Sequence, residues 1–412
     1  MSSDGSIPPR PPKPIVVPFL LTLALFSFVA VLTLSPPTRL LRKLHRLFIR
    51  PITVLLGRVP LPAALESPSN LSISIKNYSS YSHDQQLAID RKRLAYERMP
   101  ARHRRIGKHL DWRRVLERTE DAVEANSKVT DQLAAIGLEF ARKEGIPYGF
   151  NTRHKKESGR VVETLKHFVR DWSQEGKSER DALFPPILET LASEFPFAKD
   201  ESRKVLVPGC GLGRLAYEIS TQGFSTIAND FSHFMTLATS LIFSRTHSSN
   251  QHSIHPYIHS FSHQRTSQNL LRTVSFPDIV PRKQDVDLEF VQGDFLSLFF
   301  EEDEKFDAIV TLFFIDTASN LLDYFETIYR LLKPRGIWIN EGPLLYYGNP
   351  GMELPLEDVI RAAELVGFVI EKRRTLKEVR YTADAKGKQV LLATTFFLIF
   401  FFPPRSNEEA DP

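Results

Sequence analysis

The sequence predicts an α/β fold in which a parallel, Rossmann-like sheet carries helices on both faces. The first observation is an uncharged apolar run, Val205–Val207, which suits a strand buried on both sides. The second is that similar runs follow at Ser225–Ala228, Leu288–Gln292, Ala308–Phe314 and Ile337–Asn340, separated by segments of helical periodicity. Because strands that alternate with helices need crossover connections, the sheet is expected to be parallel.

A glycine-rich turn joins the first two strands. Gly209, Gly211 and Gly213 stand one residue apart, a helix is expected at Leu215–Ser220, and the second strand leads to Asp230. Glycines let backbone N–H groups approach a ligand at a helix N-terminus, and an acid at the next strand end can hold ribose hydroxyls. The spacing is not the dinucleotide fingerprint, and with the acid it resembles the S-adenosylmethionine site of class I methyltransferases. A tight turn without a ligand is the alternative.

Composition excludes some functions. The chain has 412 residues, and 53 Lys and Arg balance 49 Asp and Glu, so we expect no nucleic-acid partner. Cys210 is the single cysteine, which excludes an internal disulfide and a multi-cysteine metal site. His255, His259 and His263 repeat every four residues, but Pro256 and the lack of nearby carboxylates argue against a metal, and none is expected.

The N-terminal segment predicts a membrane anchor. Ile15–Leu34 contains 20 residues without a charge, enough to cross a bilayer. Five Lys and Arg follow between Arg39 and Arg50, so the positive-inside rule places the rest of the chain in the cytosol. We expect a tail at 1–14, a single transmembrane helix at 15–35, and a basic juxtamembrane segment with a linker at 36–82. The alternative is a cleaved signal peptide or an extraneous extension, which would leave a soluble protein of the cytosol or nucleus.

The remainder divides into two regions. Residues 83–200 are expected to form a helical region over the cofactor, with helices near Asp84–Met99, Leu110–Ala125 and Val161–Phe195, after a linker rich in Ser, Pro and Asn at Pro60–Ser82. Residues 201–412 are expected to form the catalytic core, with a substrate insertion at 244–285, since an ordered connection of that length usually serves a function. The charged residues of the 161–195 segment could cover the cofactor or form surface ion pairs; these are Arg170, Asp171, Glu179 and Arg180.

Two acidic positions follow strands of the core. Asp294, next to Phe295, ends the strand at Leu288–Gln292, where class I methyltransferases contact adenine. Asp316 follows the strand at Ala308–Phe314, at the sheet edge where open α/β sheets bind ligands. The alternative for Asp316 is an N-cap of the helix that follows it. After a helix at Pro355–Val366, an antiparallel pair at Phe368–Lys372 and Val390–Phe402 is expected to close the sheet, although the long apolar run in its second strand has no explanation from sequence.

From about His83 onwards, the chain resembles the carnosine N-methyltransferase family. The matching segments are FVRDWSQEGKSERD, VLVPGCGLGRLAYEI, PYIHSFS, FPD, QGDF, FFIDTASNLLDY and LLKPRGIWINEGPLLYY. The resemblance implies S-adenosylmethionine as methyl donor and the imidazole ring of a histidine-containing dipeptide as acceptor, as in the conversion of carnosine to anserine. It also implies a cofactor site and a substrate site. The cofactor residues are His167, Arg170, Gly209, Gly211, Gly213, Asp230, Asp294, Phe295 and Leu312. The substrate residues are Phe313, Asp316, Tyr347 and Tyr381.

Some residues depart from the family pattern. His167 stands where a glutamine is expected, and Tyr347 where a histidine is expected, which puts the identity of the acceptor in doubt. Asp316 is the expected catalytic residue, because a carboxylate that accepts the N–H of an imidazole selects its tautomer and stabilises growing positive charge. A methyltransferase acting on protein histidine or another nitrogen, and a membrane-tethered cofactor-binding protein without turnover, are the alternatives. The oligomeric state stays open, a homodimer included.

Overall fold

The computed structural model describes residues 69–146, 157–198, 202–262, 264–346, 350–380 and 393–402. The chain divides into two compact units, Met1–Leu65 and Glu66–Pro412, and everything described belongs to the second. Within those ranges, no helix combines the length and the apolar character that a bilayer span requires. The predicted anchor at Ile15–Leu34 lies outside the described residues.

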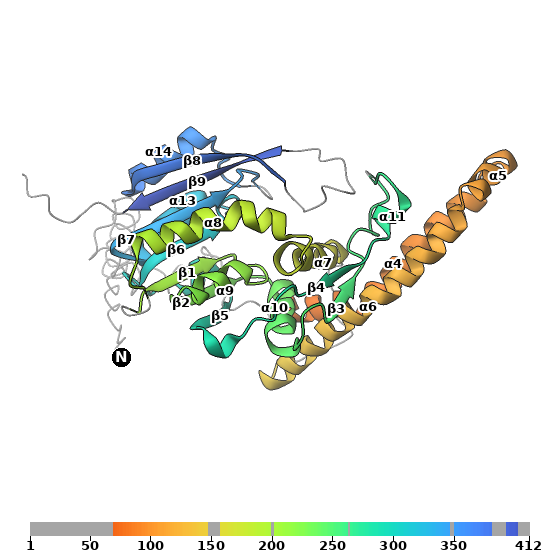
Figure 1. The fold of residues 1–412 in the computed structure, drawn as a ribbon, viewed down its shortest axis with the longest axis horizontal. Coiled ribbons are helices and arrows are strands. Elements are labelled where there is room, and N and C mark those ends of the chain that lie inside the picture. The colour runs from red at the N-terminus through yellow and green to blue at the C-terminus, as the bar shows by residue number, and fades with distance from the viewer. Residues whose placement is uncertain are drawn as a thin grey trace, which may run out of the picture. The chain divides into compact units, whose positions relative to one another are not determined.

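A seven-stranded sheet forms the centre of the described unit (Figure 1). Its strand order is β5-β2-β1-β6-β7-β9-β8, in which the first five run parallel and the last two pair antiparallel. This confirms the predicted Rossmann-like α/β fold. The bounds are β1 Lys204–Pro208, β2 Ser225–Asp230, β5 Leu288–Gln292, β6 Phe306–Leu312, β7 Leu332–Gly342, β8 Val369–Arg380 and β9 Ala393–Phe402.

The strand order accounts for the apolar run that the sequence left unexplained. β9 pairs with β7 on one side and with β8 on the other, so it is an interior strand of the sheet. Interior strands covered by helices are typically continuous apolar runs rather than alternating ones. The last strand in the chain therefore has the composition of a central strand.

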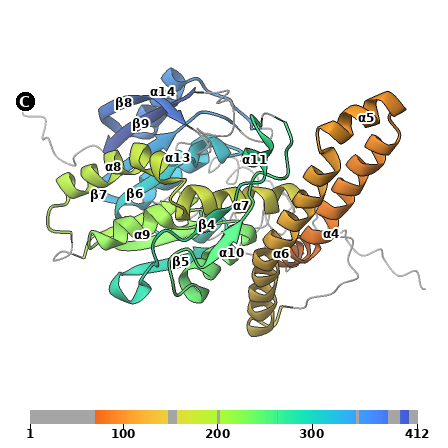
Figure 2. The ribbon, with the colours of Figure 1, turned by 45° about the vertical axis from the view of Figure 1, so that its right-hand side comes forward.

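Helices cover both faces of the sheet (Figures 1 and 2). Val205 and Val207 of β1 point to one face, where α8 (Lys177–Glu194) and α9 (Arg214–Thr221) pack. Leu206 points to the opposite face and joins the cluster of α12 (Phe295–Leu298), α13 (Leu321–Leu331) and α14 (Leu356–Val366). Successive strand residues alternate between faces, so each parallel strand contributes to both apolar layers.

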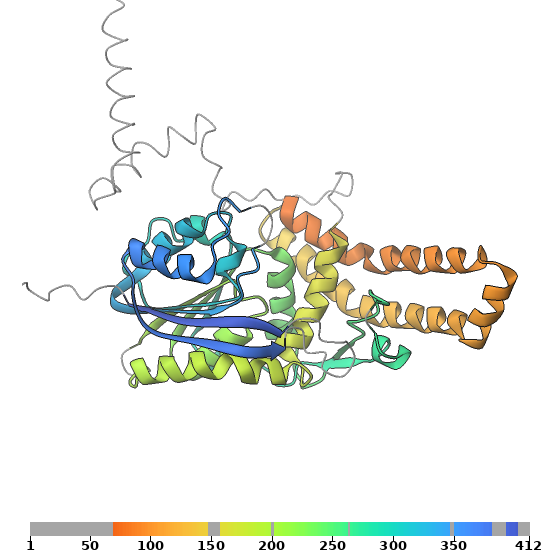
Figure 3. The ribbon, with the colours of Figure 1, turned by 90° about the horizontal axis from the view of Figure 1, so that it is seen from above.

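A helical hairpin precedes the sheet and extends away from it (Figure 3). It consists of α4 (Ser69–Glu97), α5 (Ala101–His109) and α6 (Trp112–Lys143). The prediction of a linker up to Ser82 is wrong from Ser69 onwards, because α4 begins at Ser69 and not at His83. The physical reason is the helical spacing of apolar residues, since Leu71, Ile75, Tyr78 and Tyr81 are all at most 2% exposed.

The predicted insertion at 244–285 is packed against the helical region. It contains β3 (His252–Ile254), α11 (Ser267–Leu270), β4 (Val274–Phe276) and a 3-10 turn at Lys283–Asp285, and it follows α10 (His233–Arg245). Its apolar residues share one core with α4, α6, α10 and α7 (Ser158–Trp172). Phe276, for example, stacks on Phe168 of α7 with ring centroids 4.4 Å apart. The insertion is thus in direct contact with the helix that leads into the cofactor region.

Candidate cofactor and acceptor site

The glycine turn lies at the carboxyl edge of the parallel strands, between β1 and α9. Gly209, Gly211 and Gly213 all have positive φ angles, which favour glycine. A Cβ built on Gly211 would lie 3.4 Å from Arg170 Nη2 and 3.6 Å from both Asp171 Oδ2 and His167 Nδ1. The turn and the end of α7 therefore form a cradle at Gly211 that a side chain would fill.

His167 and Asp230 border this cradle. His167 Nδ1 is buried and has no hydrogen-bond partner among the described residues, its distance to Asp171 Oδ2 being 3.9 Å. Asp230, at the end of β2, accepts hydrogen bonds from Gly211 N at 2.9 Å and from Ser232 N at 2.8 Å. Burial raises the pKa of Asp230, and the two backbone donors counteract that rise. The carboxylate is thus fixed directly against the turn.

Arg170 and Asp171 form the opposite wall. Arg170 Nε donates to Asp171 Oδ1 at 2.7 Å, and Leu212 N in the glycine turn donates to Asp171 Oδ2 at 3.3 Å. Burial alone would raise the pKa of Asp171, but the Arg170 guanidinium and His167 hold it well below its usual range. Trp172 Nε1 donates to Leu212 O at 3.0 Å, so the end of α7 is tied to the turn on two sides.

A cavity opens beside these groups, next to the ends of β1 and β6. About 470 Å³ of space free of protein atoms lies there, open solvent included, and the lining includes Arg170, Asp171, Gly209, Arg214, Leu312 and Phe313. Phe313 has a φ of 55°, a conformation that is strained for a bulky residue and is often found at functional sites. Its ring lies 5.5 Å from the Arg170 guanidinium. Leu312 and Phe313 therefore line the same cavity as Arg170 and Gly209.

Asp294 and Phe295 lie at the end of β5, on the far side of β2 from β1. Asp294 is the N-cap of α12, and its Oδ2 accepts from Ser297 N at 2.9 Å. Phe295 is 3% exposed and makes edge contacts with Phe314 and Tyr324, both with centroids 5.5 Å away. Phe295 thus packs within an apolar cluster beside the end of β6.

Asp316 lies just beyond β6, in a 3-10 turn at Ile315–Thr317. Its side chain is 7% exposed, and its Oδ2 accepts a hydrogen bond from Leu345 N at 3.1 Å. Burial raises the pKa of Asp316 to about 6, with the Leu345 N–H opposing the rise. The capping alternative is wrong, because Asn320 is the N-cap of α13 and accepts from Leu322 N. A carboxylate with this pKa is mostly ionised at neutral pH and available as an acceptor.

Other predicted residues have different outcomes. Tyr347, Tyr381 and His263 lie outside the described residues. His259 Nε2 is hydrogen-bonded to Tyr81 Oη at 2.7 Å, and burial lowers the pKa of His259 to about 4. His255 Nδ1 is hydrogen-bonded to the Leu271 carbonyl oxygen at 2.8 Å. Across the part of the chain that the structure describes, no group of three metal-ligating side chains comes together.

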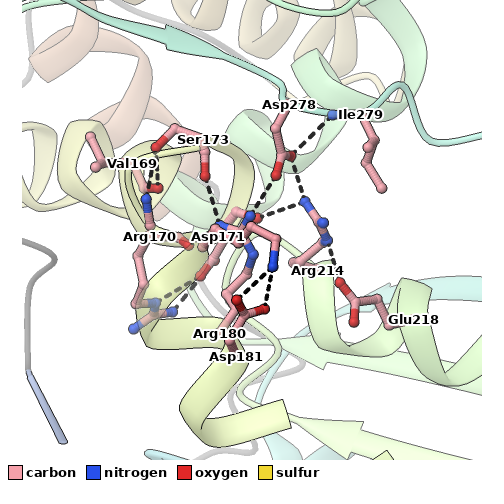
Figure 4. A network of polar contacts seen from close by, with 12 residues as sticks. Val169, Arg170, Asp171, Ser173, Arg180, Asp181, Arg214, Glu218, Asp278 and Ile279 are labelled. Carbon is pink, nitrogen blue, oxygen red and sulfur yellow. Dashed lines mark hydrogen bonds and ion pairs between the residues drawn. The ribbon is translucent and has the colours of Figure 1, made fainter. Parts of the chain in front are cut away.

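Sequence reasoning missed the contacts of Asp278, which lies next to residues of the site. It bridges two buried arginines, accepting from Arg180 Nη2 at 2.5 Å and from Arg214 Nη1 at 2.7 Å (Figure 4). Asp171, Glu179 and Arg180 are at most 4% exposed, so the alternative of surface ion pairs is wrong for these three residues. The signal available in the sequence was the FPD segment of the insertion. No neighbouring residue in the sequence indicates that its carboxylate pairs with arginines 98 and 64 positions away.

Comparison with known proteins adds the family. The family model for carnosine N-methyltransferase matches residues 151–404, a range that includes every site residue named above. The chain belongs to the carnosine N-methyltransferase family. The cofactor is accordingly S-adenosylmethionine, and the cradle at Gly211, with the buried Nδ1 of His167 beside it, fits such a group.

Individual relatives agree with this family. The carnosine N-methyltransferase of Mus musculus is 40% identical over 234 residues, which are 55% of this chain and 58% of that protein. The carnosine N-methyltransferase of Schizosaccharomyces pombe is 32% identical over 339 residues, which are 75% of this chain and 88% of that protein. The chain thus matches little more than half the length of the mouse protein.

Solved structures with similar folds are more distant. A phosphoethanolamine N-methyltransferase of Haemonchus contortus, in complex with S-adenosyl-L-methionine, is 14% identical and covers 58% of this chain and 60% of that chain, with a TM-score of 0.35. A methyltransferase of Methanosarcina mazei has the same TM-score at 16% identity, covering 54% of this chain and 99% of that one.

Proposed function

We propose that the protein is an S-adenosylmethionine-dependent N-methyltransferase that acts on the imidazole ring of a histidine-containing dipeptide. The observation that carries the proposal is Asp316, a buried carboxylate at the carboxyl edge of the sheet, where open α/β sheets bind ligands. Its Oδ2 accepts a hydrogen bond from Leu345 N–H, and Asp316 does not cap α13. The family match supports the same reaction.

The cofactor supplies an electrophilic methyl group on a sulfonium. We assign the residues around Gly211 to holding it: Asp230 to the ribose hydroxyls, and Arg170, balanced by Asp171, to the carboxylate of the methionine part. Asp294 Oδ1 would accept from the adenine amino group, since Oδ2 is engaged by Ser297 N. The backbone N–H groups of the turn and the start of α9 add partial positive charge beside the bound carboxylate.

Asp316 is assigned to the acceptor. A free imidazole has a pKa near ~6.5, so most of it is already a neutral nucleophile at pH 7 and needs no strong base. A carboxylate that accepts the N–H of one ring nitrogen holds the other nitrogen unprotonated and aims it at the methyl group. As the ring becomes positive in the transition state, the same carboxylate stabilises it. Leu345 N–H fixes the carboxylate that does so.

The experiment is a transfer assay with the full chain. Methyl-labelled S-adenosylmethionine is incubated with carnosine, free histidine and a histidine-containing protein, each alone and in competition. Label in carnosine, at a rate far above that of free histidine, is the expected result. Label confined to the protein would favour a protein-histidine methyltransferase, and cofactor binding without any transfer would favour a binding protein.

We also propose that Ile15–Leu34 anchors the chain in a membrane, with the catalytic region in the cytosol. The support is the sequence alone: 20 uncharged residues followed by the basic cluster between Arg39 and Arg50. The full chain should stay with membranes during carbonate extraction. Its recovery in the carbonate supernatant would contradict the proposal.

A further inference from the structure

The last backbone carbonyl groups of α7 need hydrogen-bond donors from outside the helix. The last carbonyls of a helix lack intrahelical donors and carry partial negative charge. Here α7 ends in a tight turn to α8, in which a Cβ on Gly176 would lie 2.2 Å from Val169 O and 2.4 Å from Arg170 O. Water has little room at such a turn, so side chains must supply the donors.

Two buried arginines supply them. Arg180 Nη1 donates to Arg170 O at 2.6 Å and to Ser173 O at 3.0 Å, and Arg214 Nη1 donates to Asp171 O at 3.1 Å. Their side chains are 5% and 8% exposed. The backbone of Arg170 and Asp171, whose side chains form one wall of the cofactor cradle, is thus held by two guanidinium groups (Figure 4).

Two guanidinium groups this close repel each other, and Asp278 offsets that repulsion. One of its oxygens accepts from Arg180 and the other from Arg214, while its backbone N–H donates to Trp172 O at 2.8 Å. The carboxylate is 9% exposed, so its interactions are screened little by solvent. Burial and the neighbouring Arg214 both lower the pKa of Arg180, and the carboxylates of Asp278, Asp171 and Glu218 oppose that shift, Asp278 most of the three.

We propose that Asp278 is a positioning residue for cofactor binding, through which the insertion at 244–285 holds Arg170 and Asp171 against the glycine turn. The inference rests on the assigned cofactor and not on the identity of the acceptor. Asp278 touches neither Arg170 nor the turn through its side chain, so it acts through Arg180 and Arg214. Without its charge, the arginines separate, the carbonyls of α7 lose donors, and the cradle at Gly211 opens.

Asp278→Asn tests this, because it keeps the size of the side chain and removes its charge. Asp307→Asn is the matched control: Asp307 is also a buried aspartate that pairs with two cations, Arg203 and Lys333, but it lies at the amino end of β6, opposite the site. The full chain is titrated calorimetrically with S-adenosylhomocysteine, which requires no acceptor, and melting temperatures are recorded for both variants.

Both variants should melt at lower temperature, but only Asp278→Asn should raise the Kd for S-adenosylhomocysteine, by tenfold or more. Its KM for S-adenosylmethionine should rise in parallel, with kcat at saturating cofactor within about threefold of the unaltered chain. If Asp278→Asn does not fold, Arg180→Lys, which keeps the charge but cannot make all three contacts, should still raise Kd. An unchanged Kd in a folded variant, or an equal rise in Asp307→Asn, would overturn the proposal. A failed search for the acceptor would leave these binding results unaffected.

Discussion

Replacing Asp316 by asparagine should make the protein more stable and less active. Burial raises the pKa of this carboxyl from its ordinary 3.8 to about 6. A rise of about two pKa units corresponds to ~3 kcal/mol by which the site favours the neutral form over the charged one. At pH 7.5 the folded protein carries the charge against that preference, and an asparagine does not.

The direction in which stability changes with pH follows from the protons bound at Asp316 in the folded and unfolded states. Between about pH 4 and pH 6, the folded protein binds more protons at Asp316 than the unfolded chain does, so its stability falls as the pH rises through this window. Above pH 6 the full cost is present. The advantage of Asp316→Asn should therefore be largest at pH 7.5, at most ~3 kcal/mol or roughly 3–6 °C in melting temperature, and should vanish near pH 4. An asparagine oxygen can still accept from Leu345 N.

Turnover should move in the opposite direction. A charge-assisted hydrogen bond of this kind is worth ~2–3 kcal/mol, so kcat should fall by roughly 30- to 150-fold. The assay pairs melting curves at pH 7.5 and pH 4.5 with initial rates and with the Kd for S-adenosylhomocysteine, which should not change. The reasoning is refuted if Asp316→Asn is less stable than the unaltered chain at pH 7.5, or if it turns over at a near-normal rate.

Three further predictions concern the rest of the site and its support. Gly211→Ala places a methyl group 3.4 Å from Arg170 Nη2 at a φ of 57°, so the Kd for S-adenosylhomocysteine should rise at least tenfold. The control Gly159→Ala, whose methyl group meets nothing within 4 Å, should leave this Kd unchanged. Equal affinities of the two variants in calorimetry would contradict the cradle. Tyr81→Phe removes the hydroxyl between Asn126 Nδ2 at 2.8 Å and His259 Nε2 at 2.7 Å, which should cost ~1–3 kcal/mol of stability in denaturant titrations. A cost below about 0.5 kcal/mol would count against this network. Because burial lowers the pKa of His259 to about 4, the stability that the neutral His259 side chain contributes above pH 6.5 is lost as the pH falls towards 4. The melting temperature of His259→Gln should therefore depend less on pH over that window. An identical pH dependence would argue against a buried neutral His259.

Much of the fold could be predicted from the sequence because its signals are local. The apolar run at Val205–Val207, the glycine spacing and the acid at Asp230 all lie within one strand-turn-helix-strand unit. The helix from Ser69 was missed because Ser and Asn dominate its first turns, and the composition concealed the spacing of Leu71, Ile75 and Tyr78.

The polar network of the site could not be predicted, because its partners are distant in the sequence. Asp278 meets Arg180 across 98 positions, and only the folded insertion places them together. The role of Asp316 was ambiguous for a different reason: several residues after β6 can cap the next helix, and Asn320 does so. Sequence identifies the types of residue at the sheet edge, whereas packing decides which of them is left for a ligand.

The most direct test of the central claim is the position of the transferred methyl group. Carnosine is incubated with the full chain and ¹³C-methyl S-adenosylmethionine, and the product is examined by NMR and tandem mass spectrometry. The account predicts one labelled methyl group on an imidazole nitrogen, with one S-adenosylhomocysteine formed for each product molecule. A methyl group on the amino end of the dipeptide, or S-adenosylhomocysteine formed without a methylated imidazole, would contradict it.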